Sequence, residues 1–213
     1  MTTRPLIGVV DHGAGNLVSI GQALEAVGAT VRLVEGPGDL AGTDGIVLPG
    51  VGHTGAAMAG LRAAGLVEAM RAPTVPLLGI CVGLQVLFDH SDEDGGACLG
   101  VIAGGVTRLV DAPTLPHMGW NQLDLVADDP LFEGIADGSL FYFVHSYAPS
   151  PTDPSVVVAT ATHGRPLVAA VRSGAVVGTQ FHPERSGADG LRVLGNFLRV
   201  VVGDLPVPTG AVA

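Results

Sequence analysis

A single cysteine, Cys81, lies between two glycines in the segment Gly79-Ile80-Cys81-Val82-Gly83. An apolar run precedes it and apolar residues at helical spacing follow it as far as Leu87, a pattern that predicts a strand, a sharp turn and a helix. Gly-x-Cys-x-Gly is the thiol version of the nucleophile elbow, in which glycines permit close packing around a strained nucleophile. A helix N-terminus there would favour the thiolate and bind an oxyanion. A small buried cysteine that only packs fits the same residues equally well.

A histidine and a glutamate follow another apolar run, in Phe181-His182-Pro183-Glu184. Residues two apart at the end of a strand point to the same side, and the proline between them fixes the backbone. A thiolate nucleophile needs a general base within hydrogen-bonding reach, and that base needs a carboxylate to hold its tautomer and orientation. Cys81, His182 and Glu184 therefore form a candidate catalytic triad.

The segment Pro49-Gly50-Val51-Gly52 comes directly after a short apolar run. Glycines on both sides of Val51 allow its peptide unit to turn an N–H toward a neighbouring strand end, as an oxyanion hole requires. An ordinary loop between a strand and a helix would carry the same residues. The elbow at Cys81 follows on the next predicted strand, and parallel strands bring both loops to one edge of the sheet.

The remaining pattern predicts the scaffold that positions these loops. Apolar runs alternate with helix-period segments in the first half, which predicts a parallel sheet, and alternating strands in the second half predict antiparallel additions. We expect one α/β domain over residues 4–202, with a mixed, mostly parallel central sheet flanked by helices, and a disordered tail over 203–213. The predicted strands are 6–10, 30–34, 45–48, a strand from Leu77 into the elbow, 106–110, 123–126, 156–160, 168–171 and 176–181, and the predicted helices are 17–27, 53–64, the segment from Cys81 through Leu87, and 191–202.

Composition excludes several classes of partner. The 213 residues are 47% hydrophobic, which is ample for a buried core, and carry 20 acidic against 10 basic residues for a net charge of -10. That sign is wrong for binding nucleic acid or an anionic membrane, so we predict neither. Two cysteines make no disulfide framework, and with neither a signal peptide nor a membrane-length apolar run the expected location is the cytoplasm.

Two other segments are read as structural. Gly13-Ala14-Gly15 lacks the third glycine of a dinucleotide fingerprint and is simpler as a tight turn, so we predict no cofactor. The acidic segment 91–96 is simpler as a solvated turn than as a metal site, so we predict no metal.

Segments 116–121 and 141–147 gather the only tryptophan and both tyrosines, and form either a satellite core or, as we favour, a binding surface.

The motif Gly79-Ile80-Cys81-Val82-Gly83-Leu84-Gln85, with Phe181-His182-Pro183-Glu184, resembles the class I glutamine amidotransferases, triad glutaminases with a three-layer, flavodoxin-like α/β fold. Further motifs resemble the glutaminase subunits of imidazole glycerol phosphate synthases, and the resemblance covers nearly the whole chain. These motifs are Pro49-Gly50-Val51-Gly52, Pro116-His117-Met118-Gly119-Trp120-Asn121, Tyr142-Phe143-Val144-His145-Ser146-Tyr147 and Asp11-His12-Gly13-Ala14-Gly15-Asn16-Leu17.

The resemblance implies that Cys81 attacks the side-chain amide of glutamine, His182 transfers the proton and Glu184 orients His182. It implies that ammonia passes to a separate barrel-shaped cyclase subunit in a heterodimer, which makes imidazole glycerol phosphate and aminoimidazole carboxamide ribotide in histidine biosynthesis. It further assigns oxyanion binding to Val51, Gly52 and Val82, glutamine binding to Gly52, Gln85, Ser146 and Tyr147, and the subunit interface to Asn16, Met118, Trp120, Asn121, Tyr142, His145 and Arg185.

Two residues depart from that family's pattern. His12 stands where the family has tyrosine, and Arg185 stands where it commonly has lysine, a change that keeps the charge but not the shape. Both departures bear on the subunit contact and leave the triad intact. The alternatives are the glutaminase subunit of another amidotransferase, a catalytically silent regulatory subunit, and a free hydrolase with the same elbow.

Overall fold

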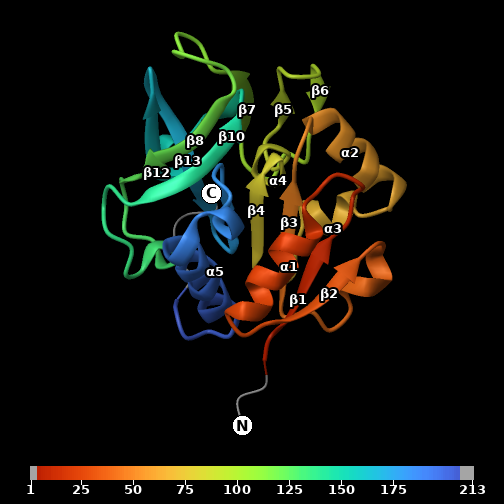
Figure 1. Cartoon of the computed structure of the whole chain (residues 1–213). Coiled ribbons are helices and arrows are strands. Elements are labelled where there is room, and N and C mark those ends of the chain that lie inside the picture. Colours follow the sequence, from red (N-terminus) through yellow and green to blue (C-terminus); the bar gives the residue numbers. More distant parts are fainter. Residues whose placement is uncertain (1–3, 207–213) are drawn as a thin grey trace.

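The computed structural model describes residues 4–206, so residues 207–213 of the predicted tail lie outside the described residues. Its centre is an eight-stranded sheet with the strand order β2-β1-β3-β4-β14-β13-β12-β9 (Figure 1). Strands β2 through β14 in this order run parallel, and β13, β12 and β9 extend the sheet by antiparallel pairing. The predicted α/β class with a mixed, mostly parallel sheet is confirmed.

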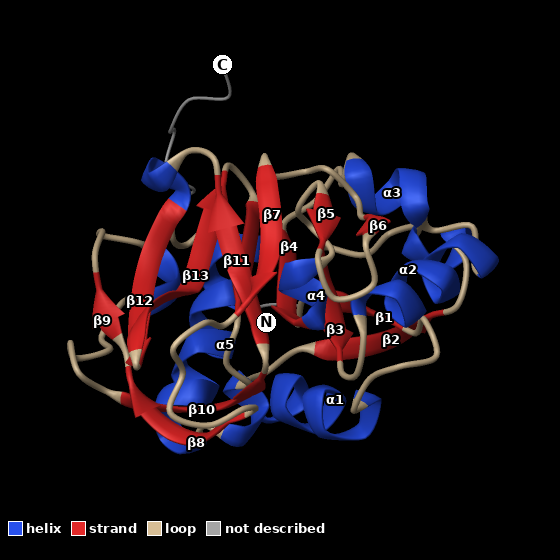
Figure 2. Ribbon diagram, turned by 90° about the horizontal axis from the view of Figure 1, so that it is seen from above, coloured by secondary structure: helices blue, strands red, loops and turns tan. Residues whose placement is uncertain are grey.

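The parallel strands are the short apolar runs of the sequence. Strands β3 (Gly45–Gly50) and β4 (Leu77–Cys81) are buried along their whole length, because helices cover both faces of the sheet. Figure 2 shows α1 and α5 on one side of these strands and α2 and α3 on the other. The remaining elements of this half are β1 (Leu6–Val10), α1 (Leu17–Ala26), β2 (Thr30–Val34), α2 (Thr54–Ala63), α3 (Val67–Arg71) and α4 (Val82–Gln85).

The chain after α4 adds two smaller sheets, with the strand orders β10-β8 and β11-β7-β5-β6, and one long helix. Several predicted boundaries are wrong here. The last helix begins at Gly187 instead of 191, and the strand predicted to reach 181 ends at Thr179. The elements are β5 (His90–Ser91), β6 (Gly96–Ala97), β7 (Gly104–Arg108), β8 (His117–Gln122), β9 (Asp124–Leu125), β10 (Leu140–His145), β11 (Tyr147–Pro151), β12 (Val157–His163), β13 (Arg165–Ser173), β14 (Val176–Thr179) and α5 (Gly187–Val201).

The aromatic segments are two strands, β8 and β10, which pair antiparallel. The alternation of a strand sends successive side chains to opposite faces. Phe141 and Phe143 accordingly have no exposed surface, whereas Met118 is 63% exposed and Trp120 is 55% exposed. The two interpretations of these segments, a satellite core and a binding surface, therefore describe the two faces of one hairpin-like sheet.

Strands β1, β3 and β4 are neighbours in the parallel part of the sheet, so the loops after them emerge at the same edge. The Val51 segment after β3 and the elbow after β4 are thereby brought together, as the sequence predicts, and the loop after β1 joins them at this edge. Within residues 4–206, no helix combines the length and the apolar character that crossing a bilayer requires.

Candidate active site

Cys81 ends β4 in a strained conformation. Its backbone has φ 55° and ψ -108°, a left-handed region that residues other than glycine rarely adopt, and α4 starts at the next residue. A Cβ placed on Gly83 would lie 1.7 Å from the carbonyl oxygen of Leu48, so only glycine lets α4 pack this closely on β3. A strained residue is retained where the surrounding structure fixes it, and this favours the nucleophile elbow over a cysteine that only packs.

The helix after the elbow is shorter than predicted. Only Val82 to Gln85, a single turn, are α-helical. The aligned peptide dipoles of one turn add little to the potential at Cys81, because the helix dipole is a sum over successive peptide units. The local N–H of Val82, at the first helical position, is the donor that the elbow offers to an oxyanion.

His182 and Glu184 form a buried pair. Nδ1 of His182 lies 2.8 Å from Oε1 of Glu184, and each side chain is 4% exposed. The pair is formed across a 3-10 turn, Pro183–Arg185, for which His182 is the N-cap, and not at a strand end as predicted. The predicted contact between the two side chains is present, and the proline at the first position of the turn fixes its backbone.

The two partners of His182 decide its protonation. Burial acts to lower the pKa of His182, but the sulfur of Cys81 and the carboxylate of Glu184 outweigh it and raise the pKa to about 10. Nε2 of His182 is buried and makes no hydrogen bond within the described part of the chain. The raised pKa favours the protonated form of the His182 ring.

Cys81 and the predicted glutamine-binding residues line one cavity of about 440 Å³, including its open mouth. Cys81 itself is only 3% exposed. The structure thus brings the predicted triad histidine, the predicted nucleophile and the predicted binding residues to one concave surface. The lining residues are Val51, Gly52, Cys81, Val82, Gln85, Glu93, Val144, His145, Ser146, Tyr147 and His182.

Glu93 is a residue of this cavity that the sequence does not predict, since the acidic segment 91–96 has the composition of a solvated turn. Its side chain is 13% exposed and accepts a hydrogen bond from the backbone N–H of Thr54, at 3.0 Å. Asp94 accepts from the N–H of Gly55, at 2.8 Å. Both carboxylates, clustered near His53, are therefore held by the start of α2, which accounts for the cluster without a metal. No local signal in the sequence links residues this far apart.

The Val51 segment is hydrogen-bonded to the loop after β1. The N–H of Val51 donates to the carbonyl oxygen of Ala14 at 3.4 Å, and the carbonyl oxygen of Pro49 lies 2.7 Å from Nε2 of His12. In this arrangement the N–H of Val51 is hydrogen-bonded to the loop after β1. Gly52 has φ +86°, which gives this loop a conformation that side chains disfavour.

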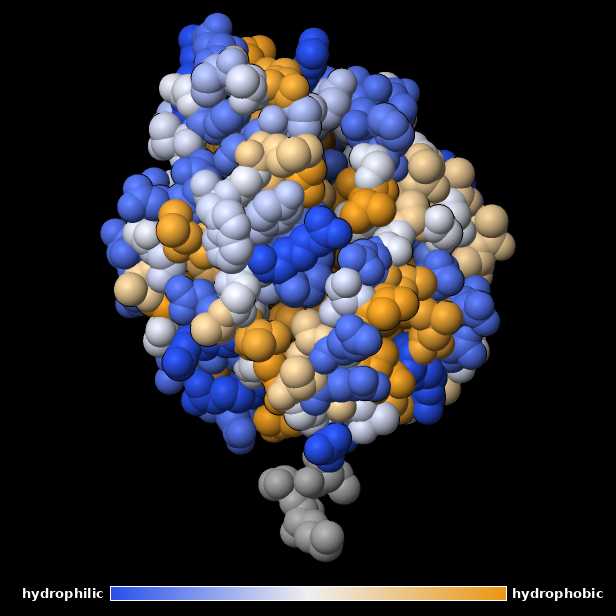
Figure 3. All heavy atoms as spheres, in the orientation of Figure 1, coloured by the Kyte–Doolittle hydropathy of each residue, from blue (hydrophilic) through white to orange (hydrophobic). Residues whose placement is uncertain are grey.

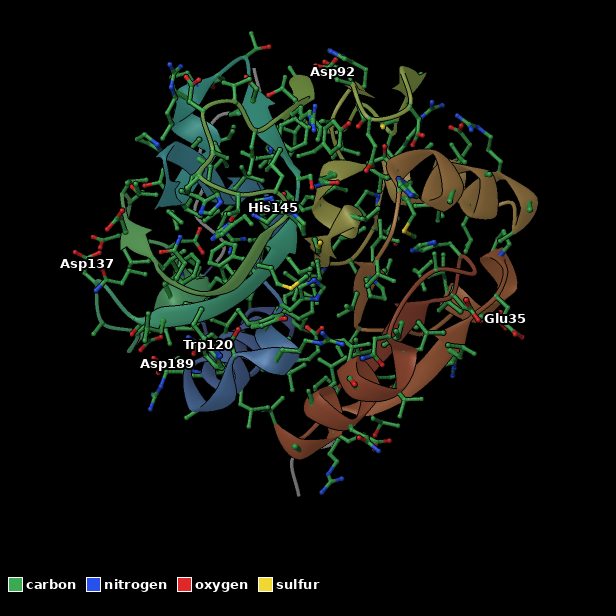
Figure 4. All side chains as sticks on the ribbon, turned by 45° about the horizontal axis from the view of Figure 1, so that its top comes forward. Glu35, Asp92, Trp120, Asp137, His145 and Asp189 are labelled. Atoms are coloured by element: carbon green, nitrogen blue, oxygen red, sulfur yellow. The ribbon has the colours of Figure 1, made fainter. Side chains whose placement is uncertain are left out.

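Three predicted interface residues form a cluster in which Trp120 and Arg185 are exposed and Tyr142 is half-buried. Trp120 and Tyr142 are opposite each other in the β8–β10 register and meet edge to face with ring centroids 6.2 Å apart. The guanidinium of Arg185 lies 5.9 Å from the centroid of the Tyr142 ring. Figure 4 shows Trp120 beside Asp189, at the start of α5, and Figure 3 shows apolar and polar residues intermixed on this side of the molecule.

The other predicted interface residues differ in their settings. Met118 is exposed on β8, and Asn16 caps α1 by accepting from the N–H of Ser19 at 3.3 Å. Asn121 is half-buried, and its side-chain nitrogen donates to the carbonyl oxygen of Thr162 at 2.9 Å.

His145 does not lie on the surface, so its assignment to an exposed interface is wrong for this chain on its own. It is 6% exposed, and it lines the cavity that contains Cys81. Its Nδ1 lies 2.8 Å from the carbonyl oxygen of Tyr147, and its Nε2 lies 3.0 Å from Nδ1 of His117. As the last residue of β10, it points to the same face as Phe141 and Phe143, which is the buried face.

This histidine pair is neutral at physiological pH. Burial lowers the pKa of His117 to about 4, with a further contribution from the nearby His163. Burial also lowers the pKa of His145 to about 3, against the hydrogen bond to Tyr147, which raises it. The hydrogen bond between the two rings requires a neutral ring, because one of the two nitrogens that it joins must accept.

We expect acid to destabilise the fold through this pair. Both folded pKa values lie below the ordinary value of 6.5, so the unfolded chain binds more protons below that pH and stability falls as the pH drops. Between about pH 7 and about pH 5 the loss is about 2 kcal/mol for each histidine, or about 4 kcal/mol for the pair. Urea unfolding of the parent and of His145→Gln measures it, and the variant should show a flatter pH dependence.

The control is His53→Gln, because the side chain of His53 is 70% exposed. It should keep the parent pH dependence of unfolding. A His145→Gln curve as steep as that of the parent would contradict the assignment of the acid sensitivity to the buried pair.

The fold and the cavity define the class of this protein. The family model of class I glutamine amidotransferases matches residues 8–201, and the chain belongs to this family. A putative GMP synthase component from Thermoplasma acidophilum has the same fold, with a TM-score of 0.72 and 20% identity over 96% of this chain and 97% of that one. A solved glutamine amidotransferase gives a TM-score of 0.72 at 22% identity, over 92% of this chain and 98% of that one.

Two relatives with higher identity show to which group within this family the chain belongs. The imidazole glycerol phosphate synthase subunit HisH of Dehalococcoides mccartyi strain 195 is 45% identical over 203 residues, 93% of this chain and 99% of the relative. The subunit of the same name from Synechococcus sp. strain JA-3-3Ab is 50% identical over 94% of this chain and 96% of the relative. Within the class I glutamine amidotransferases, the chain belongs with the glutaminase subunits of imidazole glycerol phosphate synthase.

Proposed function

We propose that this chain hydrolyses glutamine to glutamate and ammonia through Cys81, His182 and Glu184, and supplies the ammonia to a cyclase subunit in histidine biosynthesis. The observation that carries the proposal is the strained Cys81 at the elbow, in a cavity shared with a histidine that is paired to a buried glutamate. This is the geometry of nucleophile, base and orienting group. The predicted cytoplasmic location stays a prediction.

The first half-reaction forms a thioester. The sulfur of Cys81 attacks the carbon of the glutamine side-chain amide, and the amide oxygen takes up the displaced electron pair. His182, whose pKa is raised to about 10, holds a proton that it transfers to the amide nitrogen as the C–N bond breaks and ammonia leaves. Glu184, hydrogen-bonded to Nδ1, keeps Nε2 directed at the reacting atoms.

The second half-reaction restores the enzyme. Neutral His182 now accepts a proton from water, whose oxygen attacks the thioester carbon. The C–S bond breaks, glutamate is released, and the sulfur of Cys81 leaves as the thiolate beside the protonated ring. His182 gives up its proton in the first half-reaction and regains one from water in the second, so one group serves as acid and then as base.

The cavity supplies contacts for the amino-acid end of glutamine. Gly52, Ser146 and Tyr147 line it, as does the carboxylate of Glu93. A carboxylate at the edge of the cavity complements the α-ammonium group of the substrate by charge. We therefore add Glu93 to the predicted glutamine-binding residues.

We propose that the partner is a barrel-shaped cyclase subunit and that it docks on the face carrying Trp120, Tyr142 and Arg185. On this face an exposed tryptophan and an arginine each approach the ring of a tyrosine, and these residue types dominate binding energy in protein interfaces. The same face lies over the triad, since the N–H of His182 donates to the carbonyl oxygen of Tyr142 at 2.9 Å. A docked partner would thus be placed close to the site that releases ammonia.

The experiment is steady-state glutamate release from glutamine, measured for the chain alone and with a purified cyclase subunit and its ligand. We expect slow release alone and faster release in the complex. In the present arrangement the N–H of Val51 is hydrogen-bonded to Ala14, which leaves the N–H of Val82 as the proposed oxyanion donor. Equal rates would contradict activation by the partner, and no release in either sample would contradict the glutaminase itself.

Val51→Pro tests the second oxyanion donor. If docking turns the N–H of Val51 toward the substrate oxygen, proline removes that donor and should lower the stimulated rate by roughly 100- to 1000-fold. Val51→Ala keeps the N–H and removes only a side chain that is 40% exposed, so it should retain the stimulation. Binding of the cyclase subunit is measured in parallel, because a variant that no longer docks would lose stimulation for another reason. Full stimulation of Val51→Pro would exclude this donor.

A further inference from the structure

Gln180 is a buried amide residue at the site that neither the sequence motifs nor the cavity lining identifies. It follows β14 directly, has no exposed surface, and is fixed by its backbone N–H, which donates to the carbonyl oxygen of Ala169 at 2.8 Å. Its side chain reaches Cys81, with Nε2 lying 3.6 Å from Sγ. It approaches the sulfur from within the protein, because it is absent from the residues that line the substrate cavity.

The hydrogen bonds around Gln180 decide which end of its amide faces the sulfur. The carbonyl oxygen of Tyr147 can only accept, so the Gln85 atom 3.0 Å from it is the amide nitrogen. That same nitrogen lies 3.1 Å from Gln180, where it needs the amide oxygen as its acceptor. The opposite orientation would set two amide nitrogens against each other. The nitrogen of Gln180 therefore faces Cys81.

We propose that Gln180 is a catalytic residue, whose amide N–H donates to the sulfur of Cys81 and stabilises the thiolate. The inference rests on the proposed function, in which Cys81 is the nucleophile. The other neutral neighbour identified at the sulfur, the carbonyl oxygen of Val144 at 3.9 Å, can only accept and so favours the thiol. Among the described residues, Gln180 is the uncharged side chain that supplies a donor there.

A donor at this position acts in both half-reactions. A thiolate in a buried site loses its hydration, and a hydrogen bond to the charged sulfur compensates for part of that loss. Before the attack, the bond raises the thiolate population of Cys81. When the thioester breaks down, the same bond stabilises the sulfur as it leaves. Neutral Gln180 does so without competing with glutamine for the cavity.

The test is the pH dependence of Cys81 alkylation by iodoacetamide, measured without glutamine in a Cys98→Ala background so that one thiol reacts. In Gln180→Met, which keeps the length of the side chain but has no donor, the midpoint should rise by about one pH unit, a roughly tenfold drop in alkylation rate below the midpoint. Gln180→Glu keeps an oxygen for Gln85 and replaces the donor with another oxygen, so its midpoint should also rise. His182 also interacts with this sulfur, so the midpoint of each variant is compared with that of the parent.

A role limited to holding Gln85 in place predicts a different result. Because Gln85 lines the cavity, its displacement would raise KM for glutamine and leave the alkylation midpoint unchanged. Asn196→Met is the matched control, since it removes a buried amide that donates to Leu131 and Glu133, within a different part of the core. Its midpoint should equal that of the parent.

An unchanged midpoint in both Gln180 variants, with native circular dichroism, would overturn the inference. That outcome would leave the proposed function standing, because glutaminase activity is measured separately. Conversely, glutamate release that survives in Cys81→Ala would contradict the proposed function, whatever the Gln180 variants show.

Discussion

Cys81→Ala is expected to lower glutamate release by roughly 10,000-fold or more, both in the isolated chain and in a complex with the cyclase subunit. The thioester cannot form without the sulfur, and removing the nucleophile of a triad costs about as much as removing the whole triad. The variant should fold, because the side chain is small and the two hydrogen bonds of its sulfur among the described residues are long, at 3.6 and 3.9 Å. The measurement is enzymatic detection of glutamate from glutamine at saturating concentration.

Cys98→Ala is the matched control. Cys98 is buried like Cys81, and burial raises the pKa of its thiol to about 11, so it is held in the unreactive form. Its replacement should leave turnover within about twofold of the parent and cost only some stability. Near-parent turnover of Cys81→Ala, or a collapse of turnover in Cys98→Ala, would show that the nucleophile has been assigned to the wrong residue.

His182→Ala is expected to cost roughly as much turnover as the loss of Cys81, whereas Glu184→Gln should cost about ten- to a hundredfold less. His182 carries the proton in both half-reactions, and Glu184 holds and charges the ring through a single 2.8 Å contact. Glutamine at position 184 can still accept from Nδ1, so the ring keeps its orientation but loses the carboxylate that raises its pKa. The measurement is turnover of both variants across a range of pH.

The pH profiles provide a second readout of this division of roles. Because Glu184 contributes to the raised pKa of His182, Glu184→Gln should move the alkaline limb of the turnover profile to lower pH. A change that only disturbed packing would lower turnover evenly at every pH. A greater loss in Glu184→Gln than in His182→Ala would reverse the proposed roles.

Local sequence patterns are sufficient to predict much of the structure of this protein. Short apolar runs such as Leu6–Val10 and Leu77–Cys81 are read correctly as strands, because a strand buried on both faces has to be apolar along its whole length. The elbow at Cys81 is predictable for a similar reason, since glycines on both sides are a requirement of the tight packing against β3. The contact between His182 and Glu184 is predictable from two residues of separation.

Other features depend on partners that are distant in the sequence. The local pattern does not identify β8 and β10 as strands, because their exposed faces carry aromatic residues and only pairing with each other defines them. The sequence places His145 on the surface, although the strand alternation buries it. It also places Glu93 in a solvated turn, because the contact of Glu93 with Thr54 spans 39 residues.

By itself, the sequence determined the class of fold, the strand-turn-helix at Cys81 and the residue types of the triad, since each depends on neighbours within a few positions. Only the tertiary structure decided that α4 is a single turn, that the N–H of Val51 is bonded to Ala14 and that Gln180 reaches Cys81. Gln180 and Cys81 are 99 residues apart and meet because β14 and β4 pair side by side in the sheet. Contacts of that kind depend on the register of strands, which is set by the packing of the whole core and not by any local pattern.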